Sequence, residues 1–293
     1  VAQANVAEGW KADGPDGYAT NVVYNIADTA SAVANAIVGG VLNDELQAAA
    51  SITVTSAATV AEAAELSETN IAYNIGDTSE NVYTAYNSVN DADVSDRGTI
   101  QGAGTVTLTD SATVEQYVGT EQLRGLDEVV NLEGYSISDS AGALVSAVTD
   151  NASALAGAQQ VSLLTDEVLD VAQATTLTSL VNFNGFDGGF KVADSVDNIL
   201  NANPGVLAAA TSLTLVDNYE ALVSNDGGIA DVKTAFGYDD VNVRVVGLSV
   251  SQAELEDIDD LNGDGTVTYS LEGEINDIAL NSAELLNQAV DLS

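Results

Sequence analysis

The amino-acid sequence predicts an α/β fold made of short strand–helix units that recur along the chain. Three observations lead to this prediction: two sequence phrases recur, apolar and polar residues alternate within each phrase, and Ala-rich stretches follow them. Strict alternation is typical of strands, whereas apolar spacing of three and four is typical of helices. Strands separated by helices pair in parallel, so we expect a parallel sheet or a solenoid-like stack.

The first phrase is an aromatic residue, then Ile or Val two positions later, then Asp followed by Ser or Thr. Its copies follow one another at steps of roughly 50 to 60 residues, a period typical of repeat proteins. Each copy is a predicted strand. The copies occupy residues 24–29, 73–78, 135–140 and 190–195.

The second phrase is interleaved with the first and alternates Val, Ile or Leu with Thr or Ser. It occupies residues 52–56, 106–110, 161–166 and 213–217, again at steps of roughly 50 to 60 residues. These segments are predicted strands too. The stretches after the strands predict helices over residues 30–37, 58–66, 141–148 and 167–172.

Most of the strand phrases close with an aspartate, which has two interpretations. A carboxylate there can accept hydrogen bonds from the first free N–H groups of the following helix. A row of carboxylates can also bind cations, but because a helix follows each strand directly, we expect caps. Ser251 and Glu254 have the spacing of a capping box. The strand-closing residues are Asp28, Asp77, Asp110, Asp139, Asp166, Asp194 and Asp217.

The phrases divide the chain into three regions. Residues 1–20 are expected to form an N-terminal arm or cap, and residues 21–239 about four degenerate units of roughly 50 to 60 residues. Residues 240–293 are expected to be richer in strand and acidic. An aromatic cluster beside Gly-rich turns, made of Phe183, Phe186 and Phe190, is expected to pack over a repeat edge.

The composition excludes most classes of enzyme. The chain carries 45 Asp and Glu against 6 Lys and Arg, a net charge of −39, and it has no His and no Cys. Histidine-based triads, thiolate metal sites and cysteine nucleophiles are therefore excluded. Nucleic acid is not expected as a partner, because phosphate binding needs clustered cations. Apolar runs of the ~18 residues that span a bilayer are absent, so we expect no direct membrane insertion.

One local motif predicts a calcium site. Residues 260–268 read DLNGDGTVT, with oxygen ligands at the first, third and fifth positions and Gly at the sixth, as in an EF-hand-type loop. The twelfth position is Leu271, and the acid follows one residue later. The alternative is an Asn-Gly/Asp-Gly hairpin turn between two strands. The predicted ligands are Asp260, Asn262, Asp264, Thr266 and Glu272.

The two phrases together resemble repeats of very large, acidic, cysteine-free surface proteins secreted by marine bacteria and cyanobacteria. The resemblance covers roughly Tyr24 to Leu222 and extends to haemolysin-type calcium-binding, adhesin-like and surface-layer proteins that leave by type I secretion. It implies extracellular calcium binding, a surface-layer or adhesive role and no catalysis. The glycine-rich nonapeptide calcium repeat of that family is missing here.

These observations predict a non-catalytic extracellular or cell-surface protein that assembles with copies of itself, head to tail or laterally, into a layer or filament. A net charge of −39 is best tolerated in saline or calcium-rich surroundings, where ions screen the repulsion. One alternative is a monomeric adhesin or spacer module that binds a cell-surface glycan. Another is a glycan hydrolase that uses a carboxylate pair.

Overall fold

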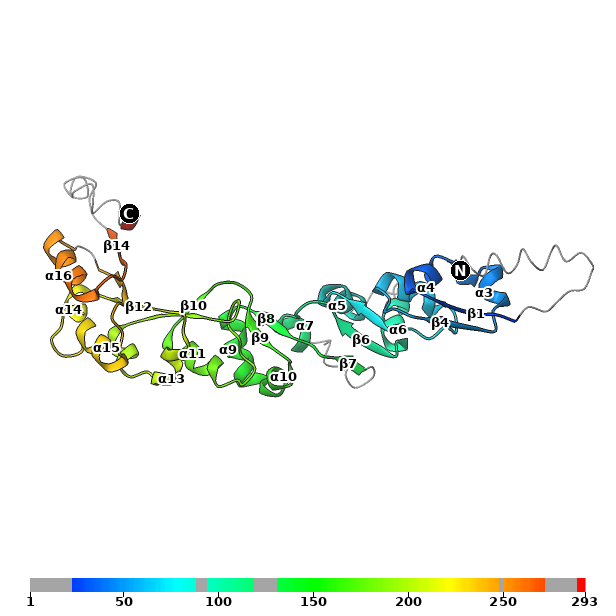
Figure 1. The fold of residues 1–293 in the computed structure, drawn as a ribbon, viewed down its shortest axis with the longest axis horizontal. Helices are drawn as coiled ribbons and strands as arrows, with labels where there is room; N and C mark the ends of the chain where they lie inside the picture. The colour runs from blue at the N-terminus through cyan, green and yellow to red at the C-terminus, as the bar shows by residue number, and fades with distance from the viewer. Residues whose placement is uncertain (1–22, 88–93, 119–130, 248–249, 272–288, 293) are drawn as a thin grey trace, which may run out of the picture. The chain divides into compact units, whose positions relative to one another are not determined.

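The computed structural model describes residues 23–87, 94–118, 131–247, 250–271 and 289–292. The chain divides into two compact units, which are described separately. Unit 1 comprises Val1–Asp139 with Asn151–Val161, and unit 2 comprises Ser140–Asp150 with Ser162–Ser293. Short helices and short parallel strands alternate in both (Figure 1), which confirms the predicted α/β fold. The predicted arm, residues 1–20, lies outside the described residues.

Apart from one short antiparallel hairpin, the strands of unit 1 pair in parallel, as expected for strands that are joined through helices. Isolated parallel bridges at Ala58–Ile75 and Ala112–Ile137 continue the pairing between the short sheets. β1 (Asn25–Asp28) pairs with β4 (Ser51–Val54); β5 (Ile75–Asp77), β6 (Thr105–Leu108) and β7 (Asn131–Glu133) form one sheet; and β8 (Ile137–Asp139) follows.

The helices of unit 1 are short and present small apolar side chains to the core. Ala63 and Leu66, for example, are both 0% exposed, so one face of their helix is fully buried. The helices are α2 (Ala30–Ala34), α3 (Asp44–Ala48), α4 (Val60–Ser67), α5 (Ser79–Asn87), α6 (Val94–Gly102), α7 (Val114–Val118) and α10 (Ala152–Gly157).

The helix expected over residues 30–37 ends early, because a hairpin begins at its last residue. β2 (Ile37–Val38) and β3 (Val41–Leu42) pair antiparallel through a two-residue turn. Gly39 and Gly40 form this turn with φ of 57° and 75°, the left-handed region that glycine adopts at least cost.

Unit 2 contains one six-stranded parallel sheet in which the strands are added in sequence order. Between β14 and β15 the register shifts at Tyr269 and Ser270. The strands are β10 (Val168–Leu169), β11 (Lys191–Asp194), β12 (Ser212–Asp217), β13 (Asn242–Val245), β14 (Val267–Leu271) and β15 (Ala289–Leu292). β9 (Val161–Leu163) lies where the chain passes from one unit to the other.

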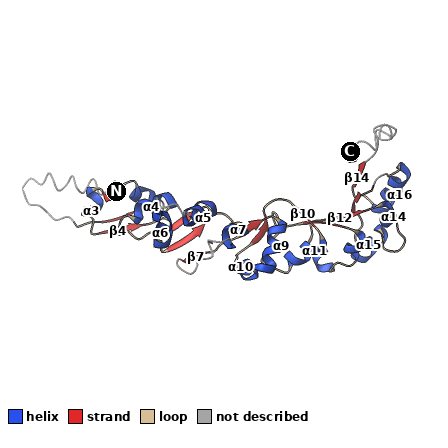
Figure 2. Ribbon diagram, turned by 180° about the vertical axis from the view of Figure 1, so that it is seen from behind, coloured by secondary structure: helices blue, strands red, loops and turns tan. Residues whose placement is uncertain are grey.

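In unit 2 the helices α9, α11 and α15 lie on one side of strands β10 and β12 in both views (Figures 1 and 2). The longest described helix, α16, follows β13 and lies inside the region expected to be rich in strand. The helices are α9 (Ala141–Asp150), α11 (Val171–Thr178), α12 (Val196–Leu200), α13 (Pro204–Ala209), α14 (Tyr219–Leu222), α15 (Ile229–Phe236) and α16 (Gln252–Asn262).

The helix expected over residues 167–172 is wrong in its first half. Val168 and Leu169 form β10 instead and pair with Lys191 and Val192 of β11. The following residue, Asp170, has extended backbone and closes a capping box with Gln173, so the helix begins only after it.

The tyrosine that opens the first phrase connects strand to helix in the same way three times. Its hydroxyl group donates a hydrogen bond to a backbone carbonyl of the helix that precedes the next strand. Tyr73 Oη bonds Thr99 O at 2.8 Å, and Tyr135 Oη bonds Ala154 O at 2.8 Å. Tyr24 Oη bonds Glu45 O at 2.7 Å. In the fourth copy, Phe190 packs against Phe183 with ring centroids 5.8 Å apart.

Candidate functional site

Six carboxylates near strand ends, which we call the bridging carboxylates, do not cap the helix that follows them. Each accepts a hydrogen bond from the first N–H group of a helix that lies earlier in the chain, at 2.6 to 3.3 Å. The bonds are Val60 N to Asp77, Ser79 N to Asp110, Val114 N to Asp139, Ala141 N to Glu167, Val171 N to Asp194 and Val196 N to Asp217.

The local cap is a different residue. Thr59, for example, accepts from Glu62 N at 3.3 Å, while Asp77 takes Val60 N at 2.8 Å. An α-helix leaves its first four N–H groups without intrahelical partners. The local cap and the bridging carboxylate therefore satisfy two of these groups from two different parts of the chain. The expectation that each carboxylate caps the helix after its own strand is wrong, because the first helix N–H group that it binds belongs to an earlier helix.

The sequence named Asp166 as one of these residues, but the bridging carboxylate there is Glu167. Asp166 forms an ion pair with Lys191 instead. The exchange follows from the chain path, since Glu167 directly precedes β10 and its Oε2 reaches Ala141 N at 3.0 Å.

Asp77 is the most enclosed bridging carboxylate, only 9% exposed. Burial raises the pKa of its carboxyl group. Hydrogen bonds from Val60 N, Asn81 Nδ2 and Thr78 N, each at 2.8 Å, lower the pKa by more, so that it lies below its ordinary value. The native structure therefore favours the ionised form at this position.

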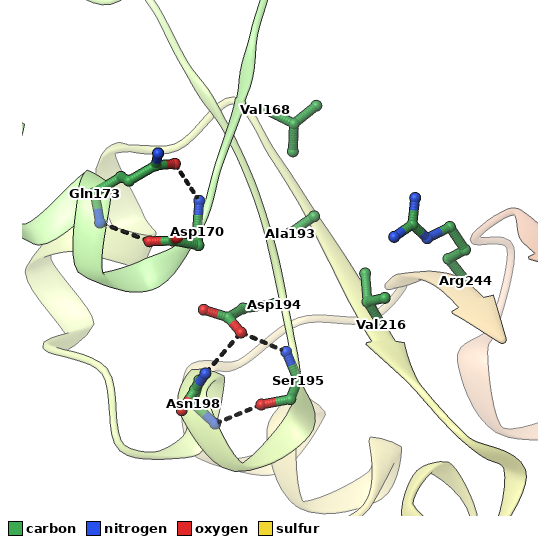
Figure 3. Close-up of a pocket in the computed structure, with 9 residues that line it drawn as sticks. All are labelled: Val168, Asp170, Gln173, Ala193, Asp194, Ser195, Asn198, Val216 and Arg244. Carbon is green, nitrogen blue, oxygen red and sulfur yellow. Dashed lines mark hydrogen bonds between the residues drawn. The ribbon is translucent and has the colours of Figure 1, made fainter. Parts of the chain in front are cut away.

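A hollow of about 580 Å³ lies at the carboxyl ends of the strands of unit 2 (Figure 3). Its floor is formed by strand residues: Val168 of β10, Ala193 of β11, Val216 of β12 and Arg244 of β13. Carboxyl ends of parallel strands are where α/β sheets most often bind ligands. The hollow is therefore the candidate functional site of this unit.

The carboxylates at the rim of the hollow are already engaged. Asp194 Oδ1 accepts from Ser195 N at 2.8 Å and from Asn198 Nδ2 at 2.7 Å, and its Oδ2 accepts from Val171 N at 2.9 Å. Asp170 Oδ1 accepts from Gln173 N at 2.7 Å. By contrast, Figure 3 shows no hydrogen bond from Arg244 to the other residues drawn. No sequence pattern singles out Arg244, because only the strand register places it beside Val216.

The residues predicted to bind calcium do not form a loop between two strands. Asp260 and Asn262 belong to the last turn of α16, and the chain then turns at Gly263, with φ of 76°, into β14. The alternative hairpin is thus not what connects these elements. Side chains two positions apart on a helix do not face each other, so Asp260 and Asn262 diverge.

Asp264 and Thr266 lie beside the residues at the start of β13. Asp240 Oδ1 accepts from Asp264 N at 2.9 Å, and Asn242 Oδ1 accepts from Thr266 N at 3.1 Å. Glu272 lies outside the described residues. Within the described ranges, no group of three or more acidic side chains is placed to hold a metal ion. Calcium binding stays a prediction.

Comparison with known proteins gives one informative similarity. The chain is similar to an S-layer protein. That protein, from Synechocystis sp. (strain ATCC 27184 / PCC 6803 / Kazusa), is 32% identical over 206 residues. The match covers 69% of this chain and 11% of the S-layer protein, so the chain spans only a small part of this relative.

No family model and no solved structure matches the chain. The similarity therefore relates it to a surface protein without supplying a site or a ligand. In the part of the chain that the structure describes, no helix is long and apolar enough to cross a membrane.

Proposed function

We propose that this chain is a non-catalytic structural segment of an extracellular surface protein, which assembles with copies of itself into a surface layer or filament. The similarity to an S-layer protein over 69% of the chain carries the proposal. The fold supports it, because strands added in sequence order leave the sheet with edges that can accept a further strand.

The charge supports an extracellular position. At −39, copies of the chain repel one another over several Debye lengths at low salt, and the repulsion shortens to about 8 Å at 0.15 M and about 3 Å at 1 M. Assembly is therefore expected to require high ionic strength or bound divalent cations.

Calcium dependence is a second part of the proposal. Asn262 is 0% exposed, its Nδ2 donates to Gly265 O at 2.6 Å, and its Oδ1 is buried without a hydrogen-bond partner in the described residues. An orphaned carbonyl oxygen that lies between Asp260 and Asp264 in the sequence suits a hard, oxygen-seeking cation. Because the two ends of the motif lie on different elements, the segment would have to rearrange to bring its oxygens together.

The first experiment is light scattering with electron microscopy of the purified chain in sea-water salt, with calcium titrated upward from chelator. Regular sheets or filaments are the expected result, and a folded monomer under every condition would refute self-assembly. For calcium, the double variant Asp260→Asn/Asp264→Asn should lose the calcium response. The matched control Asp187→Asn/Asp226→Asn changes the same charge on exposed turns and should keep it.

The hollow of unit 2 favours one alternative, a monomeric adhesin that binds a glycan. Gln173 and Asn198 supply amide groups at its rim, and Arg244 supplies a guanidinium group. Amide groups beside a cation suit a saccharide that carries an acidic group. A soluble monomer that is retained on an anionic polysaccharide column would favour this alternative over self-assembly.

A further inference from the structure

We infer that the open face of the unit 2 sheet is a docking surface for a second copy of this chain, with Arg244 as its charged anchor. The inference rests on the proposed self-assembly and names the surface through which it would occur. The open face is the side of the sheet opposite the helices. It comprises Val168, Lys191, Ala193, Ser212, Thr214, Val216, Asn242, Arg244 and Thr268.

The two faces of this sheet differ in how far their side chains are buried. On the helix side, Leu169, Val192, Leu215 and Val243 are all 0% exposed. On the open face the residues at alternate positions are exposed or half-buried, and Val168 remains 54% exposed. Parallel sheets are almost always covered on both faces. Among the described residues, nothing covers the open face, so this sheet lacks a layer that a partner can supply.

The charge of the open face is opposite to that of the chain. The chain has 45 acidic residues, yet the nine positions of this face include none, and they hold two of its 6 cations. Lys191 is paired with Asp166. Arg244 is exposed, and no hydrogen bond or ion pair engages its guanidinium group among the described residues. Arg244 is thus the cation that remains for an incoming carboxylate.

The carboxylates near Arg244 do not pair with its guanidinium group. Asp194 is committed to Val171 N, Ser195 N and Asn198 Nδ2. In the sheet itself, Arg244 lies between Val216 and Thr268, neither of which carries charge. An acidic group entering the hollow therefore meets a free guanidinium on an apolar floor, where ion pairs are screened less than at an open surface.

A second copy presents a suitable acidic surface on α16. This helix holds more carboxylates than any other described helix, and Glu256, Asp259 and Asp260 are exposed on it. Contact between the open face of one copy and α16 of the next joins two different surfaces. Such head-to-tail contacts repeat without closing and produce filaments or layers.

The first test compares two variants of equal net charge. Arg244→Gln removes the anchor, and the control Thr234→Glu adds one negative charge on the exposed side of α15, opposite the open face. The concentration at which the chain assembles is measured by sedimentation velocity and light scattering in sea-water salt. We expect Arg244→Gln to raise it about tenfold, as for loss of one partner of an interfacial charge pair, and Thr234→Glu to change it less than about twofold.

A second test locates the contact directly. Because the chain contains no Cys, single-cysteine variants report specific contacts. Thr214→Cys, on the open face, and Asp259→Cys, on α16, are mixed and cross-linked with a short bismaleimide. Mixed dimers should exceed both homodimers, and the Arg244→Gln background should reduce them. Thr234→Cys paired with Asp259→Cys is the control and should give no excess.

The outcomes separate this inference from the proposed function. If the wild-type chain never assembles, both are refuted. If it assembles while Arg244→Gln matches wild type and no mixed dimer forms, self-assembly stands and the open face is not its interface. If Arg244→Gln assembles normally but loses retention on alginate, the face binds an anionic glycan, and the inference is overturned.

Discussion

Replacing Asp77 by Ala tests whether the bridging carboxylates hold successive strand–helix units together. The substitution removes the acceptor of three hydrogen bonds, from Val60 N, Thr78 N and Asn81 Nδ2. Two of these donors are backbone N–H groups at the starts of different helices, α4 and α5. The variant therefore leaves both helix starts without a partner that the wild type provides.

The expected cost is about 3 kcal/mol in the free energy of unfolding of unit 1. A hydrogen bond to a charged group contributes about 1.5 to 3 kcal/mol, and loss of a helix cap costs about 0.5 to 2 kcal/mol. The sum of three bonds overestimates the cost, because water reaches half-buried N–H groups once the side chain is gone. Asp77→Asn keeps one acceptor oxygen and should cost less than Asp77→Ala.

Urea unfolding followed by circular dichroism at pH 7 measures the effect. Glu65→Ala is the matched control: it removes the same charge from α4, but from an exposed position, and should change stability by less than about 0.5 kcal/mol. Equal midpoints for Asp77→Ala and Glu65→Ala would show that the carboxylate contributes only its charge and would refute the reasoning.

Three further results are expected. The pKa of Asp77 is lowered in the native state. The stability that Asp77 adds over Asp77→Asn should therefore be present above the unfolded pKa of about 3.9 and disappear as pH falls through the lower native value. Urea titrations at pH 7 and pH 3 check this, and a pH-independent difference in stability would contradict it. Within α6, Gly98→Ala should stabilise unit 1 by about 0.5 to 1 kcal/mol, because nothing lies within 4 Å of the added Cβ. Gly102→Ala should destabilise it by about 1 to 3 kcal/mol, because its Cβ would lie 2.9 Å from Tyr73 Oη and displace a buried hydrogen bond; thermal melts that rank the two variants in the opposite order would disprove this assignment. Ile75→Ala removes a side chain that is 0% exposed and should cost about 2 to 5 kcal/mol by chemical denaturation, whereas a cost below 1 kcal/mol would mean that the site collapses around the smaller residue.

The strands and their parallel pairing could be predicted because each signal is local. Alternation of apolar residues with Thr or Ser selects a strand, and an intervening helix forces neighbouring strands to run the same way. All eight phrase segments overlap a strand. The aromatic cluster could also be predicted in part, since Phe183 and Phe190 pack together.

What could not be predicted depends on register. Whether Asp77 reaches Val60 N at the start of α4 is decided by how far β5 is displaced along its neighbour, and one residue of slip would change it. The same holds for the open face, where Arg244 matters only because its strand places it beside Val216. The two-residue strand β10 was not predicted, because Val168 and Leu169 also fit a helical pattern.

The predicted calcium motif shows that the spacing of ligand residues in the sequence does not by itself determine how they are arranged in space. The motif has an EF-hand-like order of oxygens, but the order has meaning only if the first residues leave the helix. Here Ser251 caps α16 and the helix continues as far as Asn262, so the first and third positions are spaced by helical geometry. The helix, which begins before the motif, therefore sets where Asp260 and Asn262 lie, while calcium binding itself stays a prediction.

Because of the bridging carboxylates, shortening the chain from its N-terminal side and from its C-terminal side should have different effects on stability. Each helix start depends on a residue that lies later in the sequence, 17 residues later for Val60 and 31 for Ser79. Trimming from the N-terminal side removes helices and leaves behind carboxylates that water can solvate. Trimming from the C-terminal side removes carboxylates. The helix that remains then has an N–H group without its hydrogen-bond partner. Fragments cut back from opposite ends by equal lengths should therefore differ in stability, with the C-terminally shortened fragment the weaker of the two.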